Sequence, residues 1–71
     1  MLRLHKSSDN TTIGVNANHI DMISIHNDGS RIYFAGGSFI DIKETFEDVM
    51  EYLETGISPE SKKKFDSLFE D

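Results

Sequence analysis

The spacing of apolar residues changes once along this chain, and that change most constrains its fold. From residue 2 to residue 42, apolar and polar residues alternate with a period of two, which is typical of strands that bury one face. From residue 44 the period becomes about 3.6, because Phe46, Val49, Met50 and Leu53 recur at the spacing of one helical face. The sequence therefore predicts a single α+β domain over residues 1–71, with antiparallel strands in residues 1–43 and helices after them.

Turn-forming residues divide the first part into four or five strands. A polar stretch at residues 6–10, the Asn-rich residues 16–19 and the pair Gly36-Gly37 each predict a turn. Asp28-Gly29 predicts a two-residue type I′ hairpin loop, because these residue types accept the positive φ angles that such a loop needs. We expect an antiparallel meander that forms a bent sheet or an incomplete small barrel.

The first predicted helix covers residues 45–54. Thr45 is placed to cap its N-terminus, with Asp48 three residues later as the acid of a capping-box-like start. Gly56 suits the position just after the last turn, where a left-handed residue often ends a helix. Both ends of this amphipathic helix are therefore predicted.

A second helix is predicted over residues 59–69. Ser58 is its expected N-cap and Pro59 its first residue, the position where proline fits best. Its apolar stripe is thin, since it holds only Phe65, Leu68 and Phe69. We expect this helix to be weakly anchored.

Charge and composition exclude several classes of function. The formal net charge is −6, and residues 41–54 hold six acids against Lys43 alone, so direct binding to nucleic acid is not expected. The absence of cysteine excludes disulfides and thiolate metal sites. No apolar run is long enough for a signal peptide or a membrane span, so we expect a cytoplasmic protein without membrane insertion.

The histidines and serines do not show a catalytic or metal-binding pattern. His19 and His26 are seven residues apart, which is not the spacing of a helical zinc pair, and His5 is far from both in sequence. The nucleophile motifs of serine hydrolases and the zinc motif H-E-x-x-H are missing. We therefore expect no enzyme activity, no cofactor and no metal.

Three sets of residues are candidates for binding. An acidic helix face that would suit a basic protein partner consists of Glu44, Glu47, Asp48 and Glu51. Tyr33 and Phe39 are out of phase with the inward residues of their strands, so together with Arg31 they are candidates for contact with a protein. Arg3, Arg31 and Lys43 would bind a small anion if the fold brought them together.

Three stretches of this chain follow the pattern of a known family: Met1-Leu-Arg-Leu4, residues 15–23 and residues 30–53, with the closest match in Ile42-Lys-Glu-Thr-Phe-Glu-Asp-Val49 at the strand-to-helix junction. In these stretches and in the order of its expected elements, the chain resembles the small FlbD/SwrD-type flagellar proteins of bacteria. The resemblance covers about residues 1–54, and similar chains also occur among small phage-type proteins. It implies a role in motility and carries no catalytic residues.

These observations favour a small non-enzymatic protein-binding or accessory module. The first alternative is an inhibitor from a phage or mobile element, which would block a host protein or sequester a small anion such as a nucleotide. The second alternative is an acidic mimic of nucleic acid. With 37% hydrophobic residues and no disulfide, the chain has a thin core, so we also expect a homo-oligomer.

Overall fold

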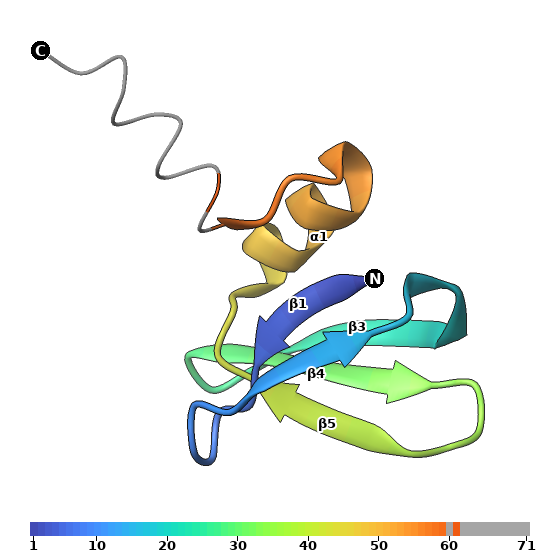
Figure 1. Ribbon diagram of the computed structural model, residues 1–71. Helices are drawn as coiled ribbons and strands as arrows, with labels where there is room; N and C mark the ends of the chain where they lie inside the picture. The colour runs from blue at the N-terminus through green and yellow to red at the C-terminus, as the bar shows by residue number, and fades with distance from the viewer. Residues whose placement is uncertain (60, 62–71) are drawn as a thin grey trace, which may run out of the picture.

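A computed structural model describes residues 1–59 and 61, and within these residues the chain forms five strands and one α-helix. The elements, in chain order, are β1 (Leu2–His5), β2 (Thr12–Val15), the 3₁₀ helix η1 (Ala17–His19), β3 (Ile20–His26), β4 (Gly29–Phe34), β5 (Phe39–Ile42) and α1 (Phe46–Thr55). All strand pairs are antiparallel, so the predicted α+β class is confirmed (Figure 1). Within the described residues, no helix is long and apolar enough to cross a membrane.

The strands form two sheets, so the prediction of one continuous meander is wrong. β1 pairs with β2, and β3, β4 and β5 form a separate three-stranded sheet in that order. In the described residues, the backbones of the two sheets are joined at a bridge between Lys6 and Ile42, beside which the Lys43 N–H donates to the His5 carbonyl oxygen at 2.9 Å and the Ser7 N–H donates to the Asp41 carbonyl oxygen at 3.1 Å.

Side chains explain why β1 does not continue along β5. The backbone N–H of His5 donates to the Glu44 carboxylate, and the backbone N–H of Arg3 donates to the Tyr52 hydroxyl, each at 3.0 Å. These two donors are therefore satisfied without a neighbouring strand. β1 turns away from β5 and lies beneath α1, as Figure 1 shows.

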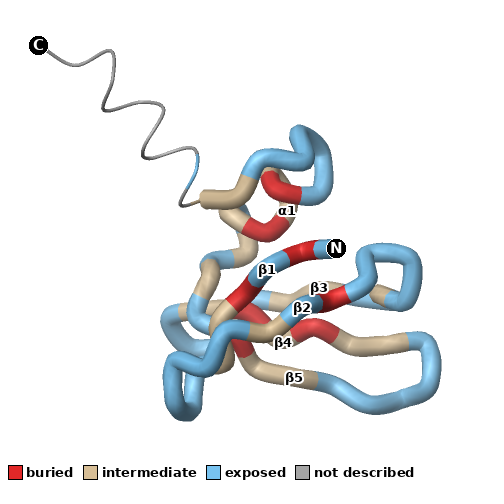
Figure 2. The backbone as a smooth tube through the Cα atoms, viewed as in Figure 1, coloured by how far each residue is buried: buried red, intermediate tan, exposed pale blue. Residues whose placement is uncertain are grey.

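The core lies between the first hairpin, α1 and the inner face of the three-stranded sheet (Figure 2). Its buried apolar residues are Leu2, Leu4, Val15, Ile32, Ile42, Val49 and Tyr52. In α1, Val49 is buried as predicted, but Leu53 is 36% exposed and Tyr52 occupies the second core position. The Tyr52 hydroxyl accepts from the Arg3 backbone, so the tyrosine can be buried without an unsatisfied polar atom.

The predicted ends of α1 are confirmed. The Thr45 hydroxyl accepts from the Asp48 N–H at 3.2 Å, and Gly56 has a left-handed φ of 74°. The Ser58 hydroxyl accepts from the Ser61 N–H at 3.1 Å, as an N-cap would. Apart from Pro59 and Ser61, the predicted helix over residues 59–69 lies outside the described residues.

The hairpin between β3 and β4 differs from the prediction. His26 pairs with Gly29, so the two loop residues are Asn27 and Asp28, and Gly29 is already part of β4. Asn27 supplies a positive φ of 53°, whereas Asp28 does not have one, which excludes a type I′ turn. Gly29 is needed for close packing instead, because a Cβ there would collide with the carbonyl oxygen of Ile42. The predicted turn at Gly36-Gly37 is confirmed.

Candidate functional site

The candidate site is the face of the three-stranded sheet that points away from the core, here called the outer face. Pairing of the strands aligns its side chains in two rows that cross β3, β4 and β5. The first row is Met22, Tyr33 and Phe39, and the second is Ser24, Arg31 and Asp41, with His26 beside the second row. The structure therefore brings together Arg31, Tyr33 and Phe39, as the strand periodicity predicts.

The first row is an exposed apolar strip. Met22 is 52% exposed and Phe39 is 54% exposed, and the rings of Tyr33 and Phe39 lie with their centroids 5.9 Å apart. The strand register places these three apolar side chains in neighbouring positions across all three strands.

Arg31 is fixed at the centre of this face. Its Nε and Nη2 atoms donate to the two carboxylate oxygens of Asp41 at 2.6 and 3.2 Å, and its Cζ lies 4.4 Å from the centroid of the Phe39 ring. The Nη2 atom also lies 3.2 Å from Nε2 of His26. A bidentate ion pair and a stacked ring together restrict the guanidinium to one position.

The ion pair between Arg31 and Asp41 shifts the pKa values of both side chains. Hydrogen bonds from Arg31 hold the pKa of the Asp41 carboxyl below the ordinary aspartate value, and the Asp41 carboxylate raises the pKa of Arg31. Because the native pKa of Asp41 is depressed, its contribution to stability is present above the unfolded pKa, near 3.9, and is lost as the pH falls through the native value.

We predict that Arg31→Gln raises the Asp41 pKa toward the ordinary value, since Arg31 is the main cause of the shift. A carbon-detected NMR titration of the Asp41 carboxyl measures both midpoints. In the wild-type chain the midpoint should lie below about 3.9. An Asp41 midpoint that is the same in both proteins would contradict the ion pair.

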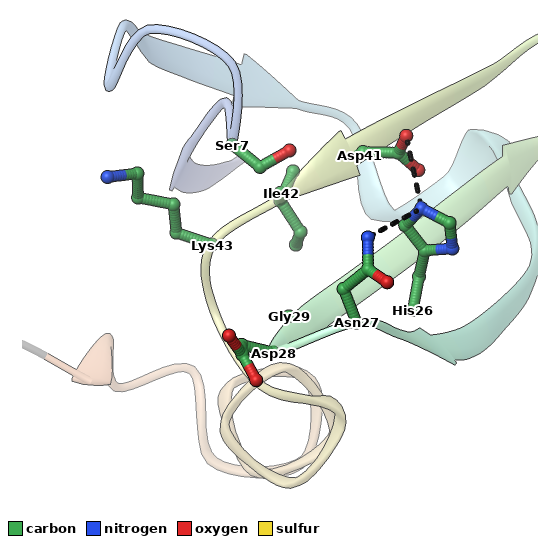
Figure 3. Close-up of a pocket in the computed structure, with 8 residues that line it drawn as sticks. All are labelled: Ser7, His26, Asn27, Asp28, Gly29, Asp41, Ile42 and Lys43. Atoms are coloured by element: carbon green, nitrogen blue, oxygen red, sulfur yellow. Dashed lines mark hydrogen bonds and ion pairs between the residues drawn. The ribbon is translucent and has the colours of Figure 1, made fainter.

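A hollow adjoins the outer face at the hairpin end of the sheet (Figure 3). Its volume is about 460 Å³, and its lining residues are Ser7, His26, Asn27, Asp28, Gly29, Asp41, Ile42 and Lys43. Nε2 of His26 lies 3.7 Å from Oδ2 of Asp41, whereas the Lys43 side chain extends away from this pair. His26 and Asp41 therefore belong both to the outer face and to the hollow.

The contacts of His26 describe the polar groups of the hollow. In the described part of the chain, His26 contacts Asp41, Arg31 and Asn27, and no hydrogen bond joins it to the Ser7 hydroxyl. Residues 1–59 and 61 also contain no group of three or more His, Asp or Glu side chains that would hold a metal ion. What the hollow offers is a polar recess beside an apolar strip.

The predicted acidic face is only partly assembled. Glu44 precedes α1, and its carboxylate turns inward to His5, with Oε1 accepting from the backbone N–H at 3.0 Å and Oε2 lying 2.7 Å from Nδ1. Its side chain is 12% exposed, so the expectation that Glu44 points into solvent with the other acids is wrong. Glu47, Asp48 and Glu51 remain on α1, and Glu47 is the exposed member.

The three cations proposed for anion binding are not brought to one hollow. Arg3 lines a recess beside His5 and Glu44, Lys43 lines the hollow of Figure 3, and Arg31 is paired with Asp41 on the outer face. Within one copy of the chain, Arg3 and Lys43 therefore line different hollows, and Arg31 lines neither of the two.

Sequence reasoning missed Met22, His26 and Asp41 as parts of the site. Their phase in β3 and β5 places them on the outer face, but only the pairing register shows that they lie beside Tyr33 and Arg31. Comparison with protein-family models, with curated proteins and with solved structures gave no match.

Proposed function

We propose that this chain is a small non-enzymatic protein-binding module and that the outer face is its binding surface. The observation that carries the proposal is the fixed position of Arg31, which is paired with Asp41 and stacked on the exposed ring of Phe39. Arginine and aromatic side chains are the residues that most often dominate the binding energy of protein interfaces.

The geometry favours a protein partner over a small molecule. The two rows of side chains lie on a sheet surface, whereas small-molecule sites are concave and enclose most of the ligand. Arg31 and Phe39 are held in place before binding, so little side-chain entropy is lost when a partner covers them. A partner side chain that enters the adjoining hollow would meet the polar groups of His26, Asn27 and Asp28.

The charge of the chain and its family resemblance suggest the kind of partner. A net charge of −6 steers basic surfaces toward the protein, so we propose a partner with a basic surface. The resemblance of residues 1–54 to FlbD/SwrD-type flagellar proteins supports a motility-related setting. The alternative role of sequestering a nucleotide has less support, because within one copy of the chain Arg3 and Lys43 line different hollows and Arg31 is paired with Asp41.

Phe39→Ala tests the proposal. Binding partners are captured on the immobilised full chain from its native host, and the dissociation constant of the purified partner is then measured by calorimetry. Truncation of the aromatic ring on which Arg31 is stacked should weaken binding about 30-fold or more, which corresponds to a loss of about 2 kcal/mol. Ile57→Ala is the matched control, since Ile57 is similarly exposed but lies beyond α1.

The acidic face of α1 provides the competing hypothesis. The double variant Glu47→Lys/Glu51→Lys reverses its charge and leaves the outer face intact. If the outer face is the binding surface, this variant should retain most of the affinity and should associate more slowly, because electrostatic steering of a basic partner is reduced. Loss of the partner in the charge-reversed variant, together with normal binding by Phe39→Ala, would show that the outer face is not the binding surface.

A further inference from the structure

We infer that the free edge of β3 is a self-association surface, through which two copies of the chain join their three-stranded sheets into one six-stranded sheet. This inference is independent of the proposed outer-face partner, because it concerns the backbone edge of the sheet. It can therefore be tested on the isolated protein.

β3 is a long strand at the edge of its sheet. It spans seven residues and pairs with β4 on one side, and in the described part of the chain no strand pairs with its other side. A bulge between Ile20 and Met22 interrupts the pairing with β4 and leaves a regular stretch from Met22 to His26. Natural edge strands are commonly protected by lysine or proline, and this stretch contains neither.

The exposed apolar residues of β3 indicate that the partner at this edge is another β-strand. Met22 points to the outer face and is 52% exposed, whereas Ile25 points to the opposite face and is 74% exposed. α1 therefore leaves this end of the inner face open. A partner on either face would cover only one of the two residues, but a strand added at the edge has side chains on both faces and covers both.

The sequence of β3 fits a second copy of itself. With a two-fold axis at Ser24, each Ile23 lies opposite Ile25 of the second copy, and each Met22 lies opposite His26 of the second copy. Asp21 then lies opposite Asn27 of the second copy, so no like charges face each other. An axis at Ile23 would instead place Asp21 opposite Ile25, which buries a carboxylate against an apolar side chain.

Charge also favours this edge over the rest of the surface. Each copy carries a net charge of −6, so two copies repel each other on approach. The stretch from Met22 to His26 contains no Asp or Glu, and Ile23 and Ile25 of each copy would meet there. This edge is consequently a place where two acidic molecules can come into contact.

Ile25→Lys tests the surface by sedimentation velocity of the full chain over a series of concentrations. The wild-type chain should change from 8.1 kDa to twice that mass as its concentration rises, and Ile25→Lys should remain monomeric. Ile57→Lys adds the same charge at another exposed isoleucine and should dimerise normally. Circular dichroism should show that both variants are folded, because both isoleucines are exposed.

A single cysteine tests the register, since the natural chain has none. Residues at the axis of an antiparallel pair have Cα atoms about 4.5–5.5 Å apart, which allows a disulfide. Ser24→Cys should therefore give a covalent dimer with oxidised glutathione, and Asp28→Cys, in the exposed hairpin loop, should not. A wild-type chain that is monomeric at every concentration would overturn the inference, and so would a dimer that survives Ile25→Lys without cross-linking at Ser24→Cys.

Discussion

Replacing Gly29 with alanine should destabilise the fold by about 3 kcal/mol, because the added methyl group has no space. Its Cβ would collide with the carbonyl oxygen of Ile42 and would lie 3.2 Å from the carbonyl oxygen of Lys43. Both obstacles are backbone atoms, so no side chain can rotate away, and β4 would have to separate from the end of β5. A domain of this length has a total stability of roughly 4–10 kcal/mol, so the variant should lose a large part of it. Urea unfolding followed by circular dichroism measures the change.

Gly36→Ala is the matched control for Gly29→Ala. Gly36 lies in the turn between β4 and β5, and a Cβ there would meet no atom within 4 Å. The same substitution should therefore change stability by no more than about 0.5 kcal/mol. If both variants unfold at the same urea concentration as the wild-type chain, then Gly29 is not in close contact with β5.

Local sequence signals predicted the elements of this fold well. Alternation of apolar residues predicted the strands, and the change of period at residue 44 placed the start of the helical region within two residues of Phe46. Thr45 and Gly56 marked the ends of α1, because a capping hydroxyl and a left-handed glycine act within a few residues of their positions. Such features need no knowledge of distant parts of the chain.

The arrangement of the strands could not be predicted in the same way. β1 leaves β5 because Glu44 and Tyr52 accept its backbone N–H groups, and these residues are 39 and 49 positions away in the sequence. The same contacts explain why Glu44 is not on the acidic face and why Tyr52 takes the core position expected for Leu53. Each of these differences depends on one long-range hydrogen bond that no local pattern contains.

The candidate site was likewise predictable from the sequence only in its local features. Strand phase predicted that Tyr33 and Phe39 point away from the core, and the structure agrees. The pairing of Arg31 with Asp41 depends on the register between β4 and β5, which the length of the turn at Gly36-Gly37 sets. Sequence reasoning assigned Asp41 to the acidic segment of residues 41–54, whereas its carboxylate serves to fix the central arginine of the outer face.

Replacing Glu44 with alanine should cost about 2–4 kcal/mol of stability, although Glu44 belongs to an acidic segment that the sequence places in solvent. Its carboxylate accepts from the backbone N–H of His5 and contacts Nδ1 of the same residue at 2.7 Å. Its own carbonyl oxygen accepts from the buried Ser30 hydroxyl at 2.7 Å. Glu44 thus connects β1, β4 and the junction that leads into α1.

Glu44→Gln separates the hydrogen bond from the charge. The amide oxygen can still accept from the His5 backbone N–H, but the amide places no negative charge beside the His5 imidazole ring. The loss of stability should therefore be smaller than in Glu44→Ala. Amide hydrogen exchange at His5 should be near the wild-type rate in Glu44→Gln and faster in Glu44→Ala, because only alanine removes the acceptor. Glu47→Gln, at an exposed position three residues further along, should change stability by no more than about 0.5 kcal/mol. If Glu44→Ala were as stable as Glu47→Gln, the carboxylate of Glu44 would not hold β1 against the start of α1, and the separation of the two sheets would need another cause.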